Sequence, residues 1–225
     1  MAAFVAAGGA GFNVTAPCKG EAHDHADDLS EIAAKSEAVN TVVVREGRLW
    51  GDNTDGRGLM RDLILNLDWQ IADKRVLVLG AGGAVRGVMG DLLGAGAAMV
   101  CVHNRTVSRA EALVQQFGDP RLTCARTNPG SDFDVILNGT SAGLGDALPD
   151  VPTSIFASAP RAYDMTYSAG STTTFNGWAA ASGALETADG LGMLVEQAAL
   201  AFELWTGMRP DTGPVIRGMR AGTND

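Results

Sequence analysis

Amide, hydroxyl, ammonium and carboxylate side chains occur together in the first quarter of the chain. Asn13 and Thr15 are two positions apart in an apolar segment, so on a strand their side chains would point the same way. Lys19 follows that segment, Asn40 comes directly after a short apolar segment, and Asp55 lies in a predicted turn. Such a set can bind a polyhydroxylated acid and transfer one proton. The spacing alone does not establish this chemistry, because Lys and Asp residues in loops are mostly solvated.

A glycine-rich turn follows the apolar run at residues 75–79 and precedes a helical pattern. The order of strand, glycine turn and helix indicates a dinucleotide site. Gly80 allows a tight turn, Gly82 lets the backbone approach a pyrophosphate, and the helix starting near Gly83 offers unpaired N–H groups. The third motif position is Val85 instead of Gly or Ala, so a plain helix-capping loop is the alternative interpretation.

The segment after the next apolar run, 98–102, indicates which dinucleotide is bound. An NAD site usually has an acidic residue about 20 positions after the glycines, where it binds the ribose 2′-hydroxyl. Here the sequence has Asn104, Arg105 and Thr106, with Arg109 one turn later. Because guanidinium groups bind phosphate in a bidentate manner, this pattern favours NADP over NAD. The alternative is that both arginines are ordinary solvated residues at a helix start.

The apolar pattern predicts the elements that must position these residues. Strands and helices alternate from residue 75 onward, which is typical of βαβ units, a parallel sheet and right-handed crossovers. The predicted strands are 12–15, 41–45, 48–50, 75–79, 98–102, 134–137 and 161–165, and the segments 41–45 and 48–50 would form a hairpin. The predicted helices are 21–34, 59–67, 83–94, 106–117 and 191–205.

Composition excludes several classes of protein. The chain has 225 residues and a net charge of −9, which disfavours nucleic-acid binding because that requires clustered Lys and Arg. Three widely spaced cysteines argue against a disulfide framework and fit a reducing compartment. No segment has the ~20 uncharged apolar residues of a membrane span. We expect no metal site, and interpret His23 and His25 as part of a solvated helix face.

Several blocks of the sequence resemble the shikimate dehydrogenase family. Any one block is a weak signal, but the blocks occur in family order, cover nearly the whole chain and are together highly specific. They are residues 11–19 (GFNVTAPCK), 38–41 (AVNT), 51–56 (GDNTDG), 80–84 (GAGGA), 104–106 (NRT), 163–165 (YDM) and 190–199 (GLGMLVEQAA).

The resemblance implies a reaction and a role for each candidate residue. The family reduces 3-dehydroshikimate to shikimate with NADPH, reversibly, so the cofactor would supply hydride and the protein a proton. Lys19 would be the acid/base residue, with Asp55 beside it. Substrate oxygens would be bound by Asn13, Thr15, Asn40, Tyr167 and Gln197. The cofactor would be bound by Gly80, Ala81, Gly82, Gly83, Ala84, Asn104, Arg105, Thr106, Arg109, Thr140, Met165, Gly190 and Met193.

We therefore expect an α/β protein of two domains with the active site in the cleft between them. A Rossmann-like, doubly wound parallel sheet spanning 55–189 would bind NADP. A smaller α/β substrate domain would comprise 1–54 and 190–225. The protein would be cytoplasmic, a monomer or homodimer, acting on a small molecule and having neither nucleic-acid nor membrane partners.

The sequence departs from the family pattern at four places, one of which is the loop at 168–174, with one extra residue and no Pro before Phe175. Family members usually begin about 45–50 residues earlier. That earlier segment carries a Ser-x-Ser pair that binds the substrate carboxylate. Residues 1–11 of this chain are interpreted as the end of a helix. Glu37 stands where a turn glycine is common, and Gly139 stands in place of alanine. Two alternatives follow: a dehydrogenase for quinate or another ring acid, and an NADP-binding protein whose catalysis is impaired by the short start.

Overall fold

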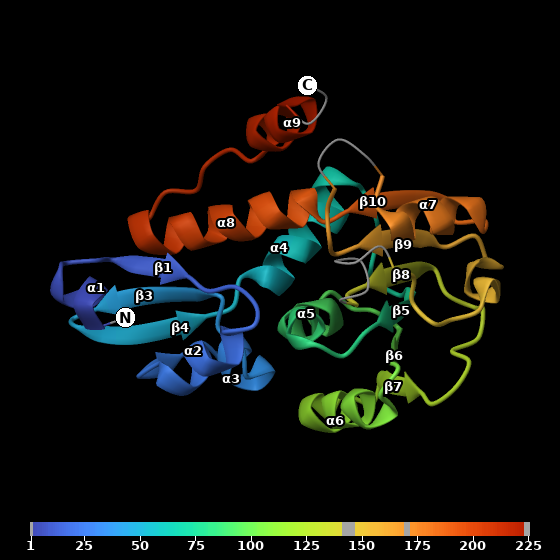
Figure 1. Cartoon of the computed structure of the whole chain (residues 1–225), viewed down its shortest axis with the longest axis horizontal. Coiled ribbons are helices and arrows are strands. Elements are labelled where there is room, and N and C mark those ends of the chain that lie inside the picture. The colour runs from blue at the N-terminus through green and yellow to red at the C-terminus, as the bar shows by residue number, and fades with distance from the viewer. Residues whose placement is uncertain (1, 141–146, 169–171, 223–225) are drawn as a thin grey trace.

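The computed structural model describes residues 2–140, 147–168 and 172–222, and contains two β-sheets (Figure 1). A four-stranded sheet lies within residues 11–52, and a six-stranded sheet lies within residues 75–189. Figure 1 shows α8 (Leu191–Thr206) running past both sheets, with α4 (Asp55–Arg61) below it in the view. The predicted α/β class is confirmed.

The six-stranded sheet is entirely parallel, as the alternation of strands and helices predicted. Its order is β10-β9-β8-β5-β6-β7, so the chain starts in the middle, builds one half and crosses back at β8 to build the other. The order reverses between β5 and β8, which is where folds of this type bind nucleotides. The strands are β5 (Arg75–Leu79), β6 (Met99–His103), β7 (Leu122–Ala125), β8 (Val135–Asn138), β9 (Arg161–Asp164) and β10 (Glu186–Asp189).

Helices cover both faces of this sheet, so its central strands are apolar on both sides. Val76 and Val78 belong to a buried cluster with side chains of α5 and α6. Leu77 and Leu79 point the other way and pack with side chains of η3 and α7. This burial holds the strand ends, and the loops that follow them, in fixed positions. The covering helices are α5 (Gly83–Gly94), α6 (Val107–Phe117), the 3-10 helix η3 (Thr153–Phe156) and α7 (Thr174–Ala181).

The four-stranded sheet is mixed and has the order β1-β3-β4-β2. The predicted hairpin is present as β3 and β4, and Ala22, Ala33 and Val39 form a small buried core on one side of it. The elements are α1 (Ala2–Ala6), β1 (Gly11–Asn13), α2 (Lys19–His25), β2 (Asp28–Leu29), α3 (Glu31–Ser36), β3 (Thr41–Arg45) and β4 (Arg48–Asp52).

The single helix predicted at residues 21–34 is wrong. The chain leaves α2 at Ala26 and forms β2 before α3 begins. Ser30 starts the new helix, because its Oγ accepts a hydrogen bond from the backbone N–H of Ala33 at 3.1 Å. Glu37 ends α3 with a φ of 49°, in the left-handed region that a glycine adopts most easily. This conformation explains why a turn glycine suits the position that Glu37 occupies.

The departure from the glycine motif at residue 85 and the departure from the family pattern at residue 139 fit each other. Val85, at the third position of the glycine motif, is fully buried on α5. A Cβ added to Gly139 would lie 2.4 Å from Val85 Cγ2 and 3.0 Å from Met165 Sδ. The missing side chain at Gly139 therefore makes room for the branched side chain of Val85.

Helix α8 joins the two sheets. Near its start it crosses α4 so closely that a Cβ added to Gly58 would lie 2.7 Å from Gln197 Cβ and 2.8 Å from Gln197 N. At its far end, Trp205 Nε1 donates a hydrogen bond of 3.0 Å to the Val42 oxygen in β3. The helix predicted at 59–67 is split into the end of α4 and the π-helix η1 (Asp62–Asn66).

Helix α9 (Gly213–Gly222) follows α8 and packs against it. None of the helices within the described residues is long and apolar enough to cross a membrane.

We expect Gly58→Ala to lower the free energy of unfolding by about 1–3 kcal/mol, because the new methyl group would overlap the backbone of Gln197. Gly177→Ala is the matched control, since Gly177 is exposed within α7 and an added Cβ would meet nothing within 4 Å. This second change should raise stability by about 0.5–1 kcal/mol. Chemical denaturation measures both, and equal effects would contradict the close packing of α4 on α8.

Candidate active site

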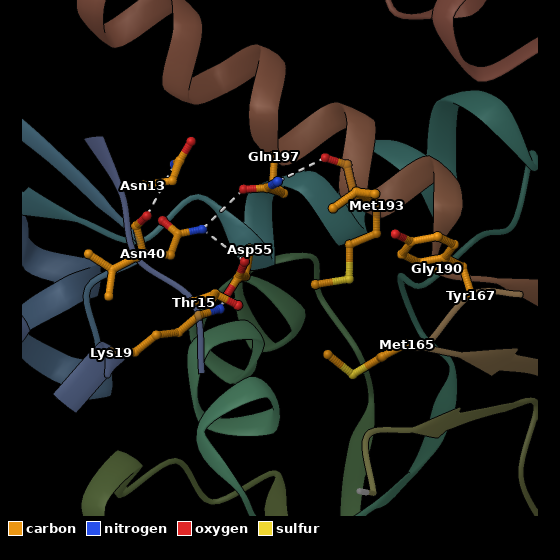
Figure 2. Close-up of a pocket in the computed structure, with 12 residues that line it drawn as sticks. Asn13, Thr15, Lys19, Asn40, Asp55, Met165, Tyr167, Gly190, Met193 and Gln197 are labelled. Atoms are coloured by element: carbon orange, nitrogen blue, oxygen red, sulfur yellow. Dashed lines mark hydrogen bonds and ion pairs between the residues drawn. The ribbon is translucent and has the colours of Figure 1, made fainter. Parts of the chain in front are cut away.

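A cavity of about 380 Å³ opens between the small sheet, α8 and the end of β9. Every residue predicted to be catalytic or to bind substrate lines it, together with three of those predicted to bind the cofactor. Figure 2 shows polar side chains gathered on one side and the methionines and Tyr167 on the other. Val14 and Leu194 also line the cavity and were not predicted. The predicted residues that line it are Asn13, Thr15, Lys19, Asn40, Asp55, Met165, Tyr167, Gly190, Met193 and Gln197.

Lys19 and Asp55 form an ion pair on the polar side of the cavity (Figure 2). Lys19 is the first residue of α2, and its backbone oxygen accepts a hydrogen bond of 2.9 Å from Val39 N, which fastens α2 to the start of β3. Asp55 begins α4, where the helix N-terminus stabilises negative charge. The Nζ of Lys19 donates to Oδ2 of Asp55, and the side chains are 17% and 8% exposed. The pair is shielded from bulk water yet reaches the cavity, so it can pass a proton to a bound molecule.

Asn40 fixes the other oxygen of the Asp55 carboxylate. Its Nδ2 donates to Asp55 Oδ1 at 2.8 Å and to Thr54 Oγ1 at 2.9 Å. Its Oδ1 accepts from Thr54 N at 2.8 Å. Because Asn40 is only 2% exposed and both ends of its amide have protein partners, it holds the turn at residues 53–55 in place. The carboxylate of Asp55 is thus oriented by Asn40 on one side and by Lys19 on the other.

Asn13, Thr15 and Gln197 add amide and hydroxyl groups to this side of the cavity. Strand β1 ends at Asn13, so Thr15 lies beyond the strand instead of within it as predicted. Gln197 Nε2 donates to Leu194 O at 2.9 Å, which leaves Gln197 Oε1 to accept from Asn40 Nδ2 at 3.3 Å. Groups of this kind can both donate to and accept from the hydroxyl groups of a ligand.

Met165, Met193 and Tyr167 form the opposite, less polar side of the cavity (Figure 2). Met165 follows β9, and its backbone N–H donates to Asn138 O at 2.9 Å. A Cβ added to Gly190 would lie 2.4 Å from Met165 O, so the two backbones touch where α8 begins. Thioether side chains adapt their shape to aromatic ligands, so this surface suits the face of a planar ring.

The turn between β5 and α5 has the shape that a pyrophosphate requires. Gly80 has a φ of 104°, and a Cβ there would lie 2.9 Å from Gly139 O. A Cβ added to Gly82 or Gly83 would meet nothing within 4 Å, so a ligand can approach the backbone. The turn leads into a helix of 12 residues whose first N–H groups have no partner within the helix. The residues present therefore fit the predicted dinucleotide, and Ala81 and Ala84 lie in the same turn.

The other predicted cofactor residues lie outside the cavity, at the carboxyl edge of the same sheet. Asn104, Arg105 and Thr106 follow β6, and Arg109 lies in the first turn of α6. Asn104 Nδ2 donates to Thr106 O at 2.8 Å, which closes the turn, and both arginine side chains are exposed. Thr140 follows β8 at the same edge. Carboxyl ends of parallel strands share one edge, so these residues and the glycine turn face the same side as Met165.

Asp91 of α5 packs behind Asp55 and was not predicted. Its Oδ2 lies 2.2 Å from the position that a Cβ on Gly56 would take, so the carboxylate is pressed against the backbone beside Asp55. Burial raises the pKa of Asp91 to about 6, and the positive charge of Arg57 partly opposes this effect. Asp91 also lines a second cavity of about 440 Å³ between α3 and α5. A single acidic residue in a helical pattern gives no local signal of such burial.

Three family models match the chain in order. The model described as "Shikimate dehydrogenase substrate binding domain" matches residues 1–42. The model described as "Shikimate / quinate 5-dehydrogenase" matches residues 63–143. The model described as "Shikimate 5'-dehydrogenase C-terminal domain" matches residues 190–217.

Similar sequences and solved structures also belong to dehydrogenases or related enzymes. The shikimate dehydrogenase (NADP(+)) of Hahella chejuensis (strain KCTC 2396) is 50% identical over 221 residues, which are 97% of this chain and 82% of that protein. The solved structure of an Ael1 enzyme from Pseudomonas putida has a TM-score of 0.89 at 41% identity, covering 96% of this chain and 80% of that one. The shikimate 5-dehydrogenase of Thermus thermophilus, in complex with NADP(H) and shikimate, has a TM-score of 0.83 at 37% identity, covering 94% of this chain and 78% of that one.

We expect Asp91→Asn to make the protein more stable than wild type at pH 8. The folded protein binds the Asp91 proton more tightly than the unfolded chain, because the pKa rises from 3.8 to about 6 on folding. The stability from this proton is therefore fully present below 3.8 and is lost as the pH rises through about 6. The gain at pH 8 should be on the order of 1 kcal/mol and should vanish near pH 4.

Thermal unfolding at a series of pH values measures this effect. Asp150→Asn, at an exposed position, is the control and should shift the unfolding temperature little at any pH. A stability gain of Asp91→Asn that does not change with pH would rule out the buried carboxylate as its cause.

Proposed function

We infer that the chain, which belongs to the shikimate dehydrogenase family, catalyses the reversible, NADP-dependent reduction of 3-dehydroshikimate to shikimate. It is an oxidoreductase that acts on a CH–OH group and serves the aromatic amino-acid pathway of that family. The observation that carries the assignment is the Lys19–Asp55 pair, which faces the surface of Met165 and Met193 across one cavity.

In the proposed reaction, NADPH held by the glycine turn at residues 80–84 would supply the hydride for the carbonyl carbon of 3-dehydroshikimate. The Lys19 ammonium donates a proton to the carbonyl oxygen, so the C=O bond becomes a CH–OH group and Lys19 is left neutral. Asp55 holds the Lys19 amine in place and accepts a hydrogen bond from the substrate. In the reverse direction, neutral Lys19 takes the proton from the hydroxyl of shikimate.

The remaining proposed roles follow from where each residue lies. Asn13, Thr15, Tyr167 and Gln197 bind substrate hydroxyl or carboxylate oxygens, and Asn40 contributes by orienting Asp55. Met165, Gly190 and Met193 flank the nicotinamide. The pyrophosphate is bound by the backbone of residues 80–84 with Thr140 nearby, and the 2′-phosphate is bound by Asn104, Arg105, Thr106 and Arg109.

The two-domain division belongs to the same proposal. Residues 55–189 form the NADP-binding unit, and residues 1–54 with 190–225 form the substrate-binding unit. The two sheets and the return of α8 to β3 through Trp205 support this division. We also propose that the enzyme works in the cytoplasm as a monomer or homodimer, since its three widely spaced cysteines and its use of NADPH suit a reducing compartment.

We expect Lys19→Ala to lower kcat by about 100- to 10,000-fold with little change in the affinity for shikimate, because the variant lacks the proton donor. Steady-state kinetics with 3-dehydroshikimate and NADPH measure kcat, and equilibrium binding measures affinity. Lys74→Ala is the matched control, since Lys74 forms an ion pair with Asp134 at 3.8 Å and does not line the cavity. A Lys19→Ala enzyme whose kcat stays within about threefold of wild type would remove Lys19 from the mechanism.

We expect Arg105→Ala to lower kcat/KM for NADPH by about tenfold or more and to leave kcat/KM for NADH unchanged, because only NADPH carries the 2′-phosphate. The assay measures kcat/KM with NADPH and with NADH. A second assay compares the rates at which the enzyme oxidises shikimate and quinate. Arg126→Ala, at a side chain that is 77% exposed, is the control. An equal loss with NADPH and NADH would contradict the proposed 2′-phosphate site. Faster turnover of quinate than of shikimate would contradict the proposed substrate.

A further inference from the structure

A buried phenol–carboxylate pair lies behind the surface formed by Met193. The hydroxyl of Tyr163 in β9 donates to Asp62 Oδ2 at 2.7 Å, and the two residues are 0% and 3% exposed. Asp62 is the first residue of the π-helix η1, an irregularity that is frequent at functional sites. Neither residue lines the cavity, and the roles assigned above use neither of them.

The pair contacts the first turn of α8 at two points. Gly190 is the N-cap of α8 and has no side chain to bond the first N–H groups of the helix. Asp189 Oδ1 accepts a hydrogen bond from Leu191 N at 3.3 Å, and the Tyr163 hydroxyl lies near enough to the Met193 backbone for that backbone to lower the Tyr163 pKa. A Cβ added to Gly192 would lie 1.9 Å from Asp62 Oδ1, so the carboxylate rests directly on the backbone of that turn. Burial and the Asp62 charge raise the pKa of Tyr163 well above its usual value, which keeps the hydroxyl protonated as a donor.

A second set of buried contacts continues this support along α8. Asn66 Nδ2 donates to Asp62 Oδ1 at 2.9 Å and to Glu196 Oε1 at 3.2 Å. Glu196, which is 1% exposed, also accepts from Arg61 Nε at 2.7 Å and from Thr212 Oγ1 at 2.7 Å. These bonds hold α8 against η1 at Glu196, one turn beyond residues 190–193, while the Asp62 carboxylate packs on the backbone of Gly192.

We propose that Tyr163 and Asp62 are positioning residues for the nicotinamide end of the NADP site. They act by fixing the turn at residues 190–193, whose Gly190 and Met193 line the cavity. This inference rests on the proposed function, because it assumes that the nicotinamide lies against Met165 and Met193. Hydride transfer needs the reacting atoms about 3–3.5 Å apart and aligned, so a small displacement of this turn changes binding and rate together.

The test compares two ligands that differ only at the nicotinamide. One is NADPH, and the other is 2′-phospho-ADP-ribose, which is the same nucleotide without its nicotinamide ring. Tyr163→Phe keeps the ring of Tyr163 and removes the hydroxyl that bonds Asp62 behind the first turn of α8. We expect its affinity for NADPH to fall about tenfold and its affinity for 2′-phospho-ADP-ribose to stay within about twofold of wild type. Calorimetry measures both.

Thr212→Val is the matched control, because it removes a hydroxyl of the same network at the end far from Tyr163. Both of its affinities should stay within about twofold of wild type. If Tyr163→Phe does not fold, Asp62→Asn serves as the second variant, since it removes the charge beneath Gly192 and keeps the size of the side chain. A selective loss of NADPH affinity of about threefold or more supports the proposal.

A parallel loss of both affinities would show a merely structural role and overturn the proposal, as would unchanged affinities. Failure of the proposed function looks different, because the wild-type protein itself would then fail to reduce 3-dehydroshikimate with NADPH, whatever its two affinities.

Discussion

The burial of the Asp55 carboxylate is the constraint on which the rest of the cavity depends. A charge on a residue that is 6% exposed must be matched by nearby donors. Lys19 comes from α2 and Asn40 from the start of β3. Helix α5 approaches through Gly87, where an added Cβ would lie 3.4 Å from Asp55 Oδ2. One carboxylate thereby brings together the small sheet, α4 and the helix that follows the glycine turn.

The proposed chemistry needs a proton donor and a hydride donor on the same carbonyl group, and the fold supplies their supports from different sheets. Lys19 belongs to the layer of the small sheet, whereas Met165 follows a strand of the large one. Helices α4 and α8 fix the position of Lys19 relative to Met165. They do so through their close crossing at Gly58 and the hydrogen bond from Trp205 to β3. Backbone-level contacts of this kind leave little freedom, which suits a site that must hold two reacting groups in register.

The local hydrophobic pattern of the sequence predicted four of the six strands of the large sheet, and it failed where contacts between distant residues determine the structure. Apolar, β-branched runs predicted β5, β6, β8 and β9, because both faces of these strands are buried. The strands β7 and β10 and the helix α7 were not predicted, and the break between α2 and α3 was missed, because short half-buried segments carry little periodic signal. The candidate residues were found from the order of family motifs. Tyr163 and Asp62 are 101 positions apart, and no local spacing could reveal their bond.

The fit between Val85 and Gly139 constrains the order in which this protein can change through evolution. Alanine at residue 139 would place its Cβ 2.4 Å from Val85 Cγ2, so the valine side chain would have to shift. Alanine at residue 85 removes this overlap and leaves a void beside Gly139, whereas a Cβ at residue 139 would still lie 3.0 Å from Met165 Sδ. A change at residue 85 before residue 139 therefore avoids the overlap, at the cost of looser packing in the intermediate. The effect of a substitution at either position thus depends on the residue at the other.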